Sequence, residues 1–107
     1  MPLYTIVLEH MGGTYIAQVT ARSTSGALRQ WARRAPLLGI PHITTARAAV
    51  LQKSRDFCEP VVVAGTRNVW CTSAVVRGEL ALFHIVMTDL AQLATRSVAV
   101  RGRVGSN

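Results

Sequence analysis

The sequence predicts an α+β domain: an antiparallel sheet of about four or five strands, built from two β-hairpins, with one or two helices packed on one face. The first observation is an alternating apolar segment folded at a Gly-Gly pair over residues 4–21. The second is an apolar segment over 69–87 with Arg77 and Gly78 at its centre. The third is the stretch between them, where apolar residues recur every three to four positions, which is the period of a helix. We therefore expect the order ββα(α)(β)ββ(α).

Residues 4–21 predict a hairpin because both strands become apolar on the same face when Gly12 and Gly13 form the loop. In this register Leu8 is opposite Ala17. Glycine at both loop positions permits the positive φ angles that type I′ and II′ turns require. The face expected to lie on the core consists of Tyr4, Ile6, Leu8, Tyr15, Ala17, Val19 and Ala21, with His10 at its end.

The first helix is expected over about 26–35, directly after the hairpin. Ser23, Thr24 and Ser25 offer hydroxyls that can cap its N-terminus, and Pro36 stops it. An apolar stripe along this helix predicts that it packs against the apolar face of the first hairpin. The stripe comprises Ala27, Leu28, Trp31, Ala32 and Ala35, and the opposite side comprises Arg29, Gln30, Arg33 and Arg34.

A second helix is expected over about 46–57, with Thr44 or Thr45 as its N-cap. It ends before Pro60, which begins a short β-branched segment over 60–64. We expect this segment to be an edge strand, because proline cannot donate to a strand ladder. The apolar side predicted for the helix comprises Ile43, Ala46, Ala49, Val50 and Phe57.

The hairpin expected over 69–87 pairs Cys71 with His84 across its two-residue loop, and it is apolar on both faces. An antiparallel strand pair of this kind is usually covered on both sides. The helices can cover one side. The other is covered either by the C-terminal segment, with a short helix from Asp89 through about Thr95, or by a second copy of the chain. One face comprises Val69, Val75, Leu80, Leu82 and Val86, and the other comprises Trp70, Val76, Phe83, Ile85 and Met87.

Length and composition indicate one compact domain over residues 1–97, followed by a basic tail over 98–107 that is expected to fray. Hydrophobic residues make up 50% of the chain and charged residues 16%, which excludes a disordered protein. The longest apolar run, over 80–87, is too short to span a bilayer, and no secretory signal opens the chain, so we expect a cytoplasmic protein without membrane contact. Cys58 and Cys71 are expected to be reduced thiols, with no metal and no cofactor.

The formal net charge of +7 is the strongest compositional signal, and all but one of the 12 cations are arginine. A guanidinium suits phosphate recognition, so a basic nucleic-acid-binding module is one interpretation. The other is a solvated basic surface that reflects GC-rich coding. Aromatic residues, which stack on bases, make up only 6% of the chain. The candidate phosphate-binding residues are Arg29, Arg33, Arg34, Arg47 and Arg55.

Cys71 and His84 are the most suggestive chemical pair, because the predicted register makes them cross-strand neighbours. Such a pair could be the nucleophile and base of a small hydrolase or half of a metal site. No third ligand or orienting group lies at a telling spacing, so a buried thiol beside a core histidine is the favoured interpretation. A second set, His10, His84 and Lys53, would suit a metal-free nuclease only if three separate elements brought it together.

The order of strand, glycine turn, strand, Ser/Thr cap and helix resembles the opening of HicB-type antitoxins over residues 4–34, with Ala27, Leu28 and Trp31 in the helix. That family has a Pro-Gly-Cys-containing third strand before its helix, whereas here Ala21 runs almost directly into the cap, and no DNA-binding module follows. As a whole the chain resembles small bacterial proteins with a ββα core and a following hairpin, some of which neutralise toxins as immunity proteins. The resemblance implies a protein partner, and no functional residue carries over from it.

We therefore predict a non-enzymatic module that binds a macromolecule, most simply a protein in the manner of immunity proteins or antitoxins, and that can self-associate as a homodimer. A nucleic-acid-binding module is the alternative, and a small hydrolase using His84 and Cys71 is the third hypothesis. The charge of +7 counts against a nuclease as partner, because the phosphate-binding surface of a nuclease is commonly basic. The residues predicted for the interface are Trp70, Phe83, Ile85 and Met87.

Overall fold

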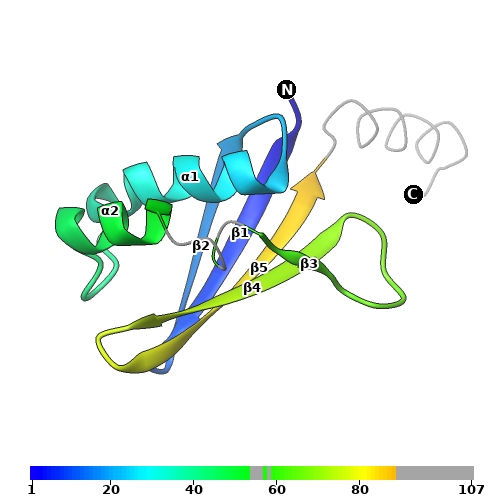
Figure 1. Cartoon of the computed structure of the whole chain (residues 1–107). Coiled ribbons are helices and arrows are strands. Elements are labelled where there is room, and N and C mark those ends of the chain that lie inside the picture. The colour runs from blue at the N-terminus through cyan, green and yellow to red at the C-terminus, as the bar shows by residue number, and fades with distance from the viewer. Residues whose placement is uncertain (54–56, 58, 89–107) are drawn as a thin grey trace, which may run out of the picture.

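The computed structural model describes residues 1–53, 57 and 59–88, which form a five-stranded antiparallel sheet with two α-helices on one face (Figure 1). The predicted α+β class is confirmed, and the described elements follow the predicted order. The helices are α1 (Thr24–Arg34) and α2 (Thr45–Lys53). The strands are β1 (Leu3–His10), β2 (Gly13–Thr20), β3 (Val61–Val62), β4 (Val69–Val76) and β5 (Glu79–Thr88).

The strand order is β2-β1-β5-β4-β3, so the two hairpins lie side by side with β5 at the centre of the sheet. β1 pairs with β5 in a register that sets Ile6 opposite Ile85 and Leu8 opposite Phe83. Successive residues of each strand therefore point alternately to an inner face, under the helices, and to an outer face. The inner face carries Tyr4, Ile6 and Leu8, and all three are buried, as predicted.

The first hairpin turns one residue earlier than predicted. Its loop is Met11 and Gly12, with φ angles of 50° and 79°, and His10 pairs with Gly13. Every cross-strand pair therefore shifts by two residues from the predicted register, which leaves the two faces unchanged. Gly13 is instead the first residue of β2, where a Cβ would lie 2.5 Å from the Tyr15 hydroxyl. This glycine makes room for the tyrosine ring and does not form the turn.

The second hairpin has the predicted register. Arg77 and Gly78 form its loop with φ angles of 55° and 75°, and Cys71 pairs with His84. Both loop residues take the left-handed conformation that a type I′ turn requires. β3 adds to the edge of this hairpin by pairing Val61 with Cys71, in the place predicted for an edge strand.

α1 begins at one of the predicted caps, where the Ser23 hydroxyl accepts a hydrogen bond of 3.1 Å from the Gly26 amide. It ends at Arg34 and continues into a short 3-10 turn, Ala35–Leu37, which contains Pro36. The helix lies across β1 and β2. Its predicted stripe is confirmed, since every member is buried: Ala27, Leu28, Trp31, Ala32 and Ala35.

The apolar side predicted for α2 is wrong within the helix itself. Ala48 and Leu51 are its buried residues. Burying a leucine removes more apolar area from water than burying an alanine, so the helix turns its Leu51 side to the core. Ile43 and Phe57, which lie outside the helix, are buried as predicted. The members of the predicted side that are exposed are Ala46, Ala49 and Val50.

An aromatic cluster joins the helical layer to the centre of the sheet. Trp31 of α1 and Phe57 each lie edge-on to Phe83 of β5, with ring centroids 4.9 Å apart in both pairs. All three side chains are fully buried. Next to the hairpin loops, the buried His10 donates its Nε2 proton to the Val76 carbonyl over 3.1 Å. This histidine is a core residue with a satisfied hydrogen bond.

Several sequence predictions lie outside the described residues. They are the short helix from Asp89 and the cover it would give the sheet, the basic tail over 98–107, and the positions of Arg55 and Cys58. In the part of the chain that is described, no helix is long and apolar enough to cross a bilayer.

Candidate functional site

The outer face of the sheet, which points away from α1 and α2, is the candidate functional surface. No described residue covers it, and its apolar side chains are open to solvent, with Ile16 67% and Val75 70% exposed. A solvated antiparallel sheet face is ordinarily polar. The described residues of the outer face include Thr5, Val7, Glu9, Thr14, Ile16, Gln18, Val69, Cys71, Ser73, Val75, Leu80, Leu82, His84 and Val86.

The outer face is mostly polar on the first hairpin, where Val7 and Ile16 are its apolar residues, and mostly apolar on the second, and we call these two parts its polar half and its apolar half. On the first hairpin, the Gln18 amide donates to the Thr5 hydroxyl over 3.0 Å, and that hydroxyl lies 3.0 Å from the Thr88 hydroxyl of β5. Polar groups of this half therefore satisfy one another across three strands. The apolar half lies on the second hairpin and consists of Val69, Val75, Leu80, Leu82 and Val86.

The residues that the sequence predicts for the interface belong to the helix-facing side of the second hairpin. Trp70, Phe83, Ile85 and Met87 point to the inner face, and Phe83 and Ile85 are fully buried there. Trp70 packs edge-on against Tyr4, with ring centroids 6.3 Å apart. Phe83 and Ile85 present nothing to a partner, and Trp70 and Met87 are half-buried against the core, so the more exposed apolar surface is the alternate set of residues on the same two strands.

The outer face carries no lysine or arginine among its described residues, although the chain has a formal net charge of +7. Glu9 and His84 are its charged or chargeable groups apart from the Cys71 thiol, and their Oε2 and Nδ1 atoms lie 3.8 Å apart. That contact is an ion pair only when the imidazole is protonated. The described cations are thus segregated from this face.

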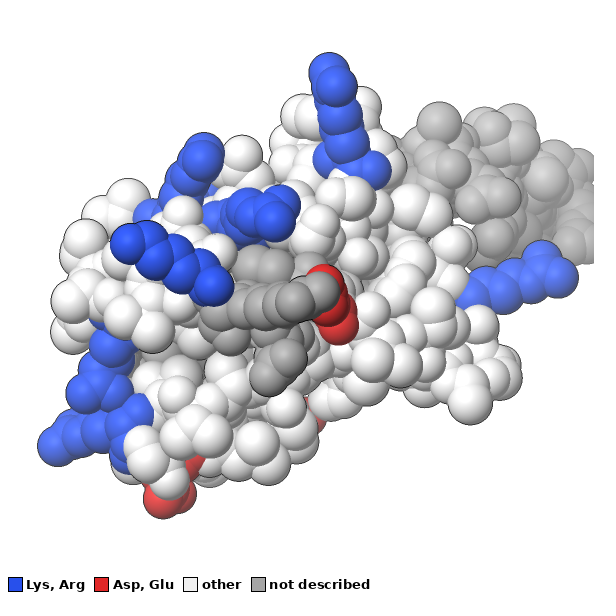
Figure 2. All heavy atoms as spheres, viewed as in Figure 1, with Lys and Arg blue, Asp and Glu red and all other residues white. Residues whose placement is uncertain are grey.

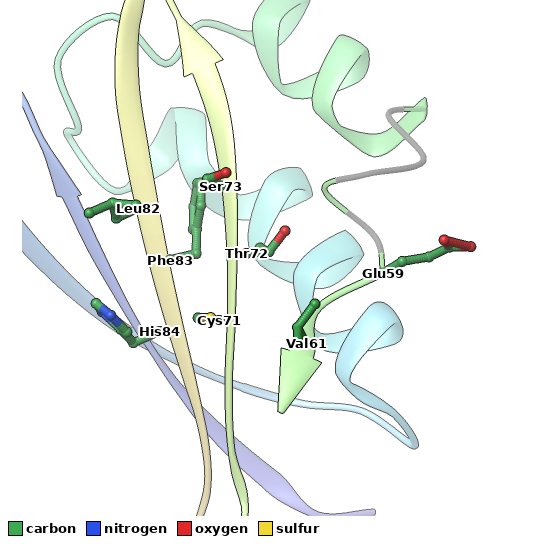
Figure 3. A pocket seen from close by; sticks show the side chains of 8 residues that line it. All are labelled: Glu59, Val61, Cys71, Thr72, Ser73, Leu82, Phe83 and His84. Carbon is green, nitrogen blue, oxygen red and sulfur yellow. The ribbon is translucent and has the colours of Figure 1, made fainter. Parts of the chain in front are cut away.

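A hollow of about 480 Å³ lies at the edge of the apolar half (Figure 3). It is lined by Glu59, Val61, Cys71, Thr72, Ser73, Leu82, Phe83 and His84. β3 pairs only with Trp70 and Cys71, and the hollow opens along β4 beyond that short pairing. Figure 3 shows Cys71 and His84 on neighbouring strands, whereas the Glu59 carboxylate points away from both. The hollow therefore makes the apolar half of the outer face concave at its edge and places a few polar groups there.

Cys71 and His84 are cross-strand neighbours as predicted, but they are half-exposed on the outer face and not a buried thiol beside a core histidine, and the described residues around them do not complete a site. No group of three described His, Cys, Asp or Glu side chains could hold a metal ion. The separation of 3.8 Å between Glu9 and His84 exceeds the hydrogen-bond reach that orients a catalytic base. His10 points to the inner face, so the second predicted set does not come together. Among the described residues, the cross-strand pairing of Cys71 with His84 is therefore the single observation that supports the hydrolase hypothesis.

The described residues among those predicted for phosphate binding all lie on the helical layer. Arg29 and Arg33 are exposed and one turn apart on α1. Arg34 donates from Nη1 to a backbone carbonyl of β2 over 3.2 Å. Arg47 is half-buried on α2, where the exposed Lys53 adds a cation that the predicted set lacks. Figure 2 shows cations gathered over the helices.

One polar contact has no signal in the sequence. Arg77, in the loop of the second hairpin, donates from Nη1 to His42 Nδ1 over 2.6 Å, although the two residues are 35 positions apart. The accepting nitrogen must be unprotonated, because a guanidinium only donates. Partial burial, then the Arg77 charge, with smaller contributions from His10 and Arg47, lower the pKa of His42 below its ordinary value of 6.5. The contact ties the hairpin loop to the segment before α2.

Comparison with protein-family models, with curated proteins and with solved structures finds no match for this chain. The resemblance of residues 4–34 to HicB-type antitoxins stays a prediction from the sequence. Function is therefore inferred from the two surfaces that the fold creates, the outer face of the sheet and the helical layer.

Proposed function

We propose that this protein is a non-enzymatic protein-binding module, and that the outer face of its sheet binds a second copy of the chain. One observation carries the proposal: the outer face has an exposed apolar half and no described cation, in a chain with a formal net charge of +7. Contact with a second apolar surface removes such side chains from water, which contributes about 25 cal/mol per Å² of apolar area. The outer face is therefore suited to a protein contact.

The size of the outer face fits a dimer that dissociates on dilution. Three of its four long strands have 8 residues. Four such strands cover about 19 Å by 26 Å, so two faces would bury about 1,000 Å² in total, which is near the lower limit of specific interfaces. Sheets stack about 10 Å apart in such a sandwich, with the aliphatic side chains of both faces interdigitated.

The charge distribution favours a face-to-face pair of identical chains. In this arrangement the two helical layers lie on opposite outer sides of the dimer. With layers spaced by about 10 Å, the cations of the two helical layers are about 30 Å apart, several times the Debye length of about 8 Å. A strongly basic chain can therefore pair with itself through this face at little electrostatic cost.

Light scattering or sedimentation over a wide concentration range tests the proposal. Leu82→Lys on the outer face and Leu38→Lys after α1 are matched variants, because the two leucines are 40% and 37% exposed. We expect a concentration-dependent dimer that Leu82→Lys abolishes and Leu38→Lys retains. A chain that stays monomeric throughout, or a dimer that both variants weaken equally, would contradict the proposal.

A different protein is the alternative occupant of the same face. The resemblance to antitoxins and immunity proteins makes a toxin encoded beside this chain the first partner to try. If the chain is monomeric and Leu82→Lys, but not Leu38→Lys, abolishes binding of that toxin, the outer face is the binding surface and self-association is wrong.

A further inference from the structure

The second surface of the molecule is the outer side of the helical layer. The described carboxylates lie elsewhere, with Glu9 and Glu79 on strands and Glu59 just before β3. Neither α1 nor α2 contains an acidic residue. The positive charge of the layer is therefore not neutralised by the helices that carry it. We call the following residues the basic helical surface: Arg29, Arg33 and Lys53, which are exposed on the helices, with Arg34 and Arg47 at the edges of the layer, where Arg34 bonds to β2 and the half-buried Arg47 lies against Val75 and Val76.

Arg29 and Arg33 form the centre of the basic helical surface. They are four residues apart on the exposed side of α1, so they project in the same direction, about 6 Å apart along the helix axis. α2 packs against α1 and brings its own cations to the same layer (Figure 2). The fully buried Trp31 packs α1 onto the sheet, so the positions of Arg29 and Arg33 are fixed by the core.

Phosphate is the ligand that the basic helical surface fits best. All of its cations except Lys53 are arginines, whose guanidinium forks donate two parallel hydrogen bonds to a phosphate. The described aromatic side chains of the helical layer, Trp31 and Phe57, are fully buried and cannot stack on unpaired bases. The surface therefore suits the backbone of a duplex better than a single strand.

We infer that the basic helical surface binds the phosphate backbone of double-stranded nucleic acid without reading its sequence. A duplex has one negative charge per about 1.7 Å of its axis, and it releases condensed counterions when protein cations replace them. Binding must then weaken steeply as the salt concentration rises. The basic helical surface and the outer face lie on opposite sides of the sheet, so this binding does not depend on self-association.

Fluorescence anisotropy of a labelled mixed-sequence duplex, measured with the full chain at several salt concentrations, tests the inference. We expect the double variant Arg29→Glu/Arg33→Glu to bind at least about tenfold more weakly, and the negative slope of log K against log salt to become less steep by about 2. The single variants Arg29→Glu and Arg67→Glu make the same charge change, but Arg67 lies in the exposed loop between β3 and β4. Arg67→Glu should therefore weaken duplex binding less than Arg29→Glu. Circular dichroism shows whether each variant is folded.

Equal weakening by Arg67→Glu and Arg29→Glu, or duplex binding that does not change with salt, would overturn the inference. Tighter binding to vesicles containing phosphatidylserine than to the duplex would assign the surface to a membrane and would overturn it too. Leu82→Lys separates this inference from the proposed dimer, because it should dissociate the dimer and keep the salt slope of each chain.

Discussion

The two hairpins expose different chemistry on the same side of one sheet. On the first hairpin, Thr5 and Gln18 form a hydrogen-bonded row that extends to Thr88 of the central strand. On the second hairpin, Leu80 and Leu82 are exposed in an aliphatic surface. No described residue covers either half. Covering the apolar half with a partner is therefore favourable, whereas the polar groups of the other half already bond to one another.

The largest expected effect separates the inner from the outer face of β5. Phe83→Ala should lower the free energy of unfolding by about 3 to 5 kcal/mol, because it leaves a cavity beside Trp31 and Phe57. Leu82→Ala, one residue away, should lower it by less than about 1 kcal/mol where the chain is monomeric, since that side chain is already exposed. Urea unfolding measures both. Similar losses would mean that the chain itself covers the outer face.

The elements whose orientation could be predicted from the sequence are those in which one side is polar. The buried stripe of α1 is marked by Arg29 and Arg33 opposite Trp31, and the faces of the first hairpin survive a wrong turn because the register moved by two residues. Alternation alone could not orient the second hairpin, which is apolar on both faces. The pairing of Ile85 with Ile6 of β1 orients it, and that contact is distant in sequence.

The remaining errors concern features that weak or distant signals decide. In α2 the apolar residues do not form one stripe, and the burial of Leu51 outweighs the alanines that the predicted side favoured. The contact between Arg77 and His42 joins two loops without any motif. For the candidate site, the apolar residues of the second hairpin were recognised, but the set assigned to the interface was the buried one, as Phe83 shows.

Thr5→Val erases part of the difference between the two halves of the outer face. It removes the hydroxyl that contacts Gln18 and Thr88, and it joins Val7 of β1 to the apolar half. We expect a dimer that is a few-fold tighter, with a loss of stability of no more than about 1.5 kcal/mol. Sedimentation measures the first and urea unfolding the second. Thr45→Val, at an exposed position of α2, is the control and should leave dimerisation unchanged. If Thr5→Val weakened the dimer, the apolar half would not be the part of the outer face that favours self-association.

The smallest expected effect concerns the loops of the two hairpins. In the second loop Arg77 donates a hydrogen bond to His42, whereas Met11, at the same position of the first loop, has no donor group. Because partial burial and Arg77 lower the pKa of His42, the contact stabilises the fold above pH 6.5, and this contribution is lost as pH falls through the lowered pKa. An NMR titration should give His42 a midpoint below 6.5. Arg77→Gln should raise the midpoint part of the way, since burial remains. A midpoint that does not move would show that the guanidinium does not hold the imidazole neutral.

A dilution series of amide NMR spectra on the full chain tests most directly whether the apolar half is a binding surface. The spectra report on every strand at once and need no substitution. We predict concentration-dependent shifts along β4 and β5, centred on Leu80, Leu82 and Val86, with the amides of α1 unchanged. Shifts centred on α1, or no shifts at any concentration, would contradict the assignment of the outer face as the surface through which this chain binds its own copy.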